Sequence, residues 1–221
     1  MAGVAVVAFA GPASANLITA NSSPFSITDI VPTSITGGPA PLQATLTFSN
    51  FTFVGTTFST NILVQNQTVG FPSARLTDFG FNTQPNATGI SDTSTVFTTF
   101  LNSNLPSVGV VDVCASTGPT CAGGGGGDLA PGASNAFTLS LTGLPAGTTQ
   151  VELGANTINS PTETYFFKWQ TGIGSFESSC VFGGSCGSTV QTPEPMSLAL
   201  LGVGLTGLGL IRWRSARANR G

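Results

Sequence analysis

The chain has 221 residues, of which only 7% are charged, whereas about a quarter is usual in soluble globular proteins. It contains no histidine, which excludes a serine–histidine–aspartate triad, a histidine-ligated zinc site and histidine acid–base catalysis. Before residue 200 the basic residues are Arg75 and Lys168. Residues 16–192 therefore hold two basic and eight acidic side chains, a net charge of −6. An acidic body lacks the basic surface that nucleic-acid binding requires, so we expect no nucleic-acid partner.

Residues 1–15 form a short apolar run that ends in an A-x-A pattern at Ala13 and Ala15. This combination is typical of a secretory signal peptide, so we expect a mature chain that begins at Asn16. The basic residues that normally precede the apolar core are missing, which suggests a start codon upstream of Met1. The alternative is that the run is a buried apolar strand.

Residues 42–48 and 137–142 alternate between apolar and polar side chains, as half-buried β-strands do. The phase of the first segment shifts at Ser49 and Asn50, which predicts a bulge, and the sequence around Gly55 predicts a turn. Similar patterns predict strands around 58–64, 77–81, 96–100, 108–113, 151–153 and 165–169.

About eight or nine such strands, separated by Gly, Pro and Asn clusters, predict an all-β domain over residues 16–177. We expect an antiparallel β-sandwich with an interior rich in the 16 phenylalanines, or, as the alternative topology, a jelly roll. Nothing before residue 196 has a convincing helical period. The aromatic residues at 165–169 are more simply core residues than a carbohydrate platform.

Four cysteines occur as two close pairs, Cys114 with Cys121 and Cys180 with Cys186. An even number of cysteines at local spacing in an exported protein suggests disulfides, and we favour these two pairings because each closes a short loop. The alternative is a four-thiolate metal site, although its six and five intervening residues exceed the usual spacing of about two to four.

The chain contains five consecutive glycines at 123–127, just after Cys121, which superficially resemble a phosphate-binding loop. The loop lacks the Gly-Lys-Ser/Thr ending, so a flexible loop tethered by a disulfide is the simpler interpretation. Asp112 and Asp128 flank the Cys114–Cys121 loop, and a Ca²⁺ shared between them is the one weak cofactor hypothesis. A glycosidase needs two carboxylates placed across a sugar site, and in any chain with eight scattered acids some two could be matched to that requirement. The pattern is therefore not specific, and we predict no catalytic residue and no metal ligand.

Residues 178–192 are rich in Ser, Gly and Thr and are expected to be a spacer. After them, Pro193-Glu194-Pro195 precedes an uncharged apolar stretch at 196–211, which as a helix spans roughly 24 Å of a hydrocarbon core of about 30 Å. We expect a transmembrane helix whose basic tail, residues 212–221, stays in the cytoplasm. The arginines of that tail are Arg212, Arg214, Arg217 and Arg220.

The motif, the apolar stretch and the arginine cluster resemble, in this order, the PEP-CTERM sorting signal of Gram-negative bacteria. The resemblance covers residues 193–221 only. It implies that an exosortase, a membrane-spanning protease or transpeptidase, recognises Pro193, Glu194 and Pro195. It also implies transient anchoring in the inner membrane before the product reaches the cell surface or the extracellular polysaccharide. The alternative is a plain membrane anchor that no enzyme processes.

The block from Val111 to Asp128, within a strand-rich body, is similar to the cistern family of PEP-CTERM proteins. This resemblance implies an exported β-rich domain and adds no catalytic residues. We therefore expect a non-enzymatic protein of the cell surface or biofilm matrix, whose ligand would be polysaccharide or another surface protein. The alternatives are an extracellular hydrolase, which needs two acids converging in a cleft, and an ice- or surface-binding protein, which needs a flat threonine-rich face.

Overall fold

The computed structural model describes residues 16–106, 108–122, 128–155, 165–180 and 190–192, and the structural statements below concern these residues. They form antiparallel strands and one four-residue helix, α1 (Thr33–Thr36), which confirms the expected all-β fold. The strands are β1 (Asn16–Thr19), β2 (Phe25–Val31), β3 (Leu42–Val54), β4 (Thr57–Asn66), β5 (Arg75–Phe81), β6 (Thr83–Gln84), β7 (Gly89–Asp92), β8 (Thr98–Leu105), β9 (Gly109–Ser116), β10 (Ser134–Thr142), β11 (Gln150–Leu153), β12 (Tyr165–Thr171), β13 (Gly174–Cys180) and β14 (Val190–Thr192).

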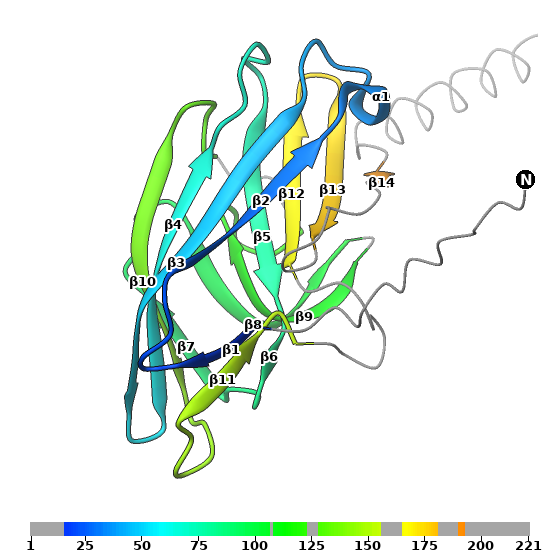
Figure 1. The fold of residues 1–221 in the computed structure, drawn as a ribbon. Helices are drawn as coiled ribbons and strands as arrows, with labels where there is room; N and C mark the ends of the chain where they lie inside the picture. The colour runs from blue at the N-terminus through cyan, green and yellow to red at the C-terminus, as the bar shows by residue number, and fades with distance from the viewer. Residues whose placement is uncertain (1–15, 107, 123–127, 156–164, 181–189, 193–221) are drawn as a thin grey trace, which may run out of the picture.

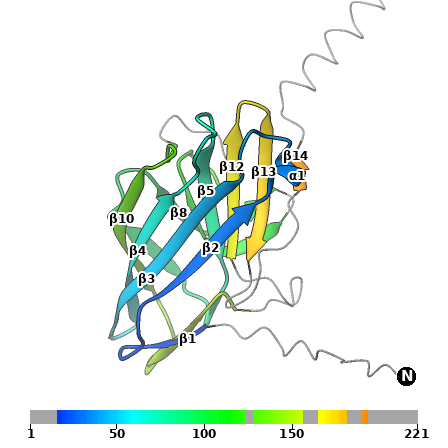
Figure 2. The ribbon, with the colours of Figure 1, turned by 45° about the horizontal axis from the view of Figure 1, so that its top comes forward.

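Two large sheets pack face to face (Figures 1 and 2). One has five strands in the order β2-β3-β4-β10-β7, and the other has six in the order β14-β13-β12-β5-β9-β8. A small third sheet, β1-β11-β6, lies at the lower end of the molecule in Figure 1. This arrangement matches the expected antiparallel sandwich, with an additional sheet that the sequence pattern did not predict.

The alternating pattern of the sequence explains the strands of the five-stranded sheet. Along β4 every second side chain is buried, as the apolar–polar alternation predicts. The β3–β4 register shifts between Ser49 and Thr52, where Asn50 adopts a φ of 54°, which confirms the predicted bulge. Gly55, with a φ of 62°, supplies the left-handed conformation of the hairpin turn that follows.

Phenylalanines from both sheets fill the space between the layers, as expected. The ring of Phe48 on β3 meets that of Phe81 on β5 edge-on, with centroids 5.5 Å apart. The rings of Phe79 on β5 and Phe137 on β10 are tilted relative to each other, with centroids 6.5 Å apart. No aromatic side chain among the described residues is exposed, so the aromatic run of β12 is part of the interior and offers no carbohydrate platform.

The end of the body differs from the expected spacer. β13 continues to Cys180, beyond the expected domain end at residue 177, and β14 pairs with it at residues 190–192. The signal segment with Ala13 and Ala15, Cys186 and the whole of 193–221 lie outside the described residues. Within the described part of the chain, no helix is long and apolar enough to cross a membrane.

Candidate functional site

A row of polar side chains crosses the outer face of the six-stranded sheet. Ser116 on β9 pairs with Asp78 on β5, Asp78 pairs with Lys168 on β12, and Lys168 pairs with Glu177 on β13. Direct register partners point to the same side of a sheet. The phenylalanine adjacent to each charged residue in the sequence belongs to the main core, so the row faces away from that core.

The three charged members of this row are buried. Lys168 is 4% exposed, Glu177 is 3% exposed and Asp78 is fully covered. The Lys168 Nζ atom lies 3.3 Å from Glu177 Oε1 and donates a hydrogen bond of 2.5 Å to the carbonyl oxygen of Ala122. A buried ion pair must offset the cost of removing two charges from water, so such groups are retained only where neighbouring polar atoms hold them.

Neither oxygen of Asp78 accepts a hydrogen bond within the described residues, and Lys168 forms its ion pair with Glu177 on the other side. The Thr77 hydroxyl donates to the carbonyl of Lys168, and the Ser116 hydroxyl donates to the carbonyl of Thr120. Burial raises the pKa of Asp78 above its usual value. The Ser116 and Thr77 hydroxyls and the Lys168 charge act in the opposite direction but do not offset burial. The neutral acid is therefore favoured relative to an exposed aspartate.

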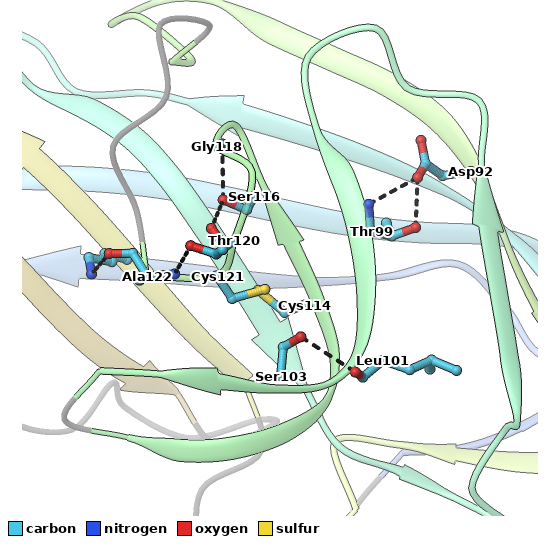
Figure 3. Close-up of a disulfide and its surroundings, with 11 residues drawn as sticks. Asp92, Thr99, Leu101, Ser103, Cys114, Ser116, Gly118, Thr120, Cys121 and Ala122 are labelled. Carbon is cyan, nitrogen blue, oxygen red and sulfur yellow. Dashed lines mark hydrogen bonds between the residues drawn. A yellow bond between two sulfur atoms is a disulfide. The ribbon is translucent and has the colours of Figure 1, made fainter.

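A short loop after β9 contacts the row through the Ala122 carbonyl, which accepts the hydrogen bond from Lys168. Figure 3 shows this loop and its disulfide. The disulfide between Cys114 and Cys121 fastens this loop and confirms the first predicted pairing. Within the loop, the Ser116 hydroxyl accepts a hydrogen bond from Gly118 N and donates to the carbonyl of Thr120 (Figure 3). The loop thereby carries the Ala122 carbonyl to Lys168. The cysteines pack in a small apolar cluster beside the row that also contains Leu105, Val111 and Phe166.

Two further predictions from the sequence concern the Cys180–Cys186 disulfide and a calcium ion shared by Asp112 and Asp128. None of the described cysteines is a free thiol, but the Cys180–Cys186 pairing involves a residue outside the described part and stays a prediction. Asp112 accepts a hydrogen bond from Thr83 N, and Asp128 accepts one from the Thr117 hydroxyl. No three acidic or cysteine side chains of the described residues come together as a metal-binding group.

A third buried carboxylate, Asp29, lies between the two large sheets. Asp29 on β2 accepts hydrogen bonds from the Trp169 indole at 3.0 Å and from the Ser178 hydroxyl at 2.6 Å, and the Cys180 sulfur lies 3.5 Å from its other oxygen. Burial raises the pKa of Asp29 to about 6, although the two hydrogen bonds act against this rise. Its inward position on β2, between Ile27 and Val31, is the one sequence signal that marks it.

The outer face of the five-stranded sheet carries neutral polar side chains. The only charged residues of these five strands are Asp29 and Asp92, and both have register partners whose side chains are in the core. On the outer face, Asn61 accepts a hydrogen bond from Thr138 and lines with it a hollow of about 260 Å³. Cross-strand hydroxyl pairs continue this surface at Ser26–Thr47, Thr28–Thr45 and Ser59–Ser140.

Comparison with known proteins adds no assignment to these features. No protein-family model matches the chain, and no curated protein matches it. The functional argument therefore rests on the residues themselves.

Proposed function

We propose that the protein is a non-enzymatic component of the cell surface or extracellular matrix of a Gram-negative bacterium. Export through residues 1–15 and sorting by an exosortase through Pro193-Glu194-Pro195 are supported by the sequence features described above. The body supports a structural or adhesive role, since the acids described so far are either enclosed or bonded to nearby polar groups. The hollow described above is lined by Asn61, Thr93, Ala136, Phe137 and Thr138, none of which is acidic, so it does not favour the hydrolase alternative.

The observation that carries the adhesive role is the neutral outer face of the five-stranded sheet. Most of its side chains are hydroxyls and amides, interrupted by Ile30, Leu63 and Ala136. Hydroxyls and amides are donors and acceptors suited to the hydroxyl groups of a sugar polymer. The rest of the body is acidic, so an acidic polymer would be repelled at low salt. We therefore propose a neutral polysaccharide as the ligand of this face.

Placing one charge on this face tests the adhesive role. Ala136 is exposed beside the hollow, so Ala136→Glu introduces a carboxylate there, whereas Ala146→Glu places the same charge on an exposed loop. We expect Ala136→Glu to lose co-sedimentation with insoluble neutral polysaccharide and Ala146→Glu to retain it. Equal binding by both variants would contradict the proposal.

The sorting part of the proposal has a separate test. Replacing Pro193, Glu194 and Pro195 with alanine is expected to leave the protein in the inner-membrane fraction, whereas the unchanged protein reaches the surface. Deleting residues 193–221 should release it without anchoring. Surface delivery of the alanine variant at the normal level would favour a plain anchor.

The same face supports one second candidate, an ice- or surface-binding role, because serine and threonine hydroxyls dominate it. Leu63 and Ala136 interrupt these hydroxyls within one cross-strand row, so the face lacks a regular threonine array. Thermal hysteresis by the purified protein that is lost in Ala136→Glu would favour this candidate over polysaccharide binding.

A further inference from the structure

We propose that Lys168 and Asp78 condense into an intramolecular amide cross-link between β12 and β5, with Glu177 as the group that transfers the protons. The proposal concerns the covalent structure of the domain and does not depend on its ligand. It rests on the order of these residues in one row, on their enclosure, and on the chemistry of an amine placed between two acids.

Register brings the reacting groups together. Lys168 lies directly opposite Asp78, and the Cβ atoms of such antiparallel partners are about 4.5–5.5 Å apart. Glu177 lies opposite Lys168 on its other side. The Lys168 amine is held by Glu177 and by the Ala122 carbonyl, so it must leave these partners and turn toward Asp78 before it can react.

Asp78 fits the role of the carbon that is attacked. A carboxylate resists an amine nucleophile because it is negatively charged and has a poor leaving group, whereas a neutral carboxylic acid does not carry that charge. Asp78 is fully buried, neither of its oxygens accepts a hydrogen bond within the described residues, and burial outweighs the opposing effect of the Ser116 and Thr77 hydroxyls and the Lys168 charge. Its raised pKa has the same cause and favours the neutral acid.

Glu177 fits the role of the base. It lies 3.3 Å from Lys168 Nζ, within reach for a proton transfer after a small adjustment. Transfer of a proton from the ammonium to Glu177 replaces the two charges of the ion pair with two neutral groups. The product is the neutral amine, which is the nucleophilic form of lysine.

The step balances without any co-reactant. Lys168 Nζ attacks Asp78 Cγ and a nitrogen–carbon bond forms. Protonated Glu177 donates to the departing hydroxyl as the carbon–oxygen bond breaks, and the carboxylate then takes a proton from the nitrogen. The ammonium, the neutral acid and the glutamate anion become one amide, one water molecule and a protonated glutamate. Nothing is oxidised or reduced.

Intact-mass measurement of the purified full chain tests the proposal directly. We expect a mass lower by one water molecule than the sequence and its disulfides require. Trypsin cannot cleave after an acylated lysine, so the digest of the reduced protein should contain one peptide spanning 76–212 in place of 76–168 and 169–212. A pepsin digest should yield a branched peptide that joins the segments around Asp78 and Lys168.

Two variants serve as controls. Lys168→Arg keeps a positive charge but cannot form the amide under these conditions, so it should show the full mass and normal tryptic cleavage at residue 168. Glu177→Gln keeps the shape but removes the base, and we expect condensation at least about 100-fold slower.

Three results would overturn the assignment. Full mass together with cleavage after Lys168 in the unchanged protein would refute the cross-link, and this measurement needs no variant to fold. Water loss that persists in Lys168→Arg would place the reaction elsewhere. A branched peptide that joins Lys168 to Glu177 would reverse the roles of the two acids.

Discussion

Asp29 joins the two layers of the sandwich, and replacing it with asparagine tests the cost of its charge. The pKa of Asp29 is about 6 in the folded protein against an ordinary value of 3.8. Below the lower value both folded and unfolded chains hold the proton, and the full stability is present. Between the two values the unfolded chain ionises first, so stability falls as the pH rises, and above the upper value it stays constant.

The size of this fall follows from the two pKa values. One pKa unit corresponds to about 1.4 kcal/mol, so the rise at Asp29 corresponds to a loss of about 3 kcal/mol of stability between acid and neutral pH. Asp29→Asn cannot ionise and should not show this component. Other carboxylates titrate in the same range, but they do so equally in both proteins, so the difference between the two curves isolates Asp29.

Urea unfolding, followed by tryptophan fluorescence from about pH 3.5 to about pH 7.5, provides the assay. The free energy of unfolding of the unchanged protein should fall across this range by about 3 kcal/mol more than that of Asp29→Asn. Ser178→Ala removes a hydrogen bond to the carboxylate, so it should raise the pKa of Asp29 further and enlarge the fall. Parallel curves for the unchanged protein and Asp29→Asn would refute the reasoning.

Three further predictions concern stability. Replacing both Cys114 and Cys121 with serine removes a cross-link at a sequence separation of 7, and the free energy of unfolding in urea should drop by about 2.5 kcal/mol; an unchanged midpoint would contradict this. Gly80→Ala places a Cβ 2.9 Å from a backbone oxygen of β9, so thermal unfolding should show that the free energy of unfolding falls by about 1–3 kcal/mol. An unchanged melting temperature would mean that the strands shift apart at little energetic cost. Trp169→Phe removes the indole N–H that donates to Asp29, so the free energy of unfolding measured in urea above pH 7 should fall by about 1.5–3 kcal/mol, as is typical of hydrogen bonds to charged groups. Equal stability of the two proteins would show that this bond contributes nothing.

The strands that sequence reasoning found are those whose buried face is apolar. β4 and β10 follow the alternation of their residues closely, because one side of each strand meets the core and the other meets water. β2 and β13 were missed for the opposite reason. Their inward positions include Asp29 and Ser178, whose polar groups bind each other across the two layers and so interrupt the apolar pattern of each strand.

The charged row was beyond prediction because it depends on strand order. Asp78 and Lys168 are far apart in the sequence and appear there as isolated charges, and only the pairing of β5 with β12 makes them neighbours. Contacts between residues close in the sequence were easier to predict. The short spacing of Cys114 and Cys121 was enough to predict their disulfide, since a short loop needs no knowledge of the sheet.

The place of β12 in its sheet determines when the fold can form. β12 lies between β13 and β5, although β5 ends at Phe81 and β12 begins only at Tyr165. One edge of β5 therefore has no strand to pair with until most of the body has been synthesised. Because β5 and β12 are far apart in the sequence, their pairing is expected to form slowly. The six-stranded layer is thus assembled after its chain is nearly complete, so a nascent fragment that stops before β12 is expected to remain unfolded and prone to aggregate.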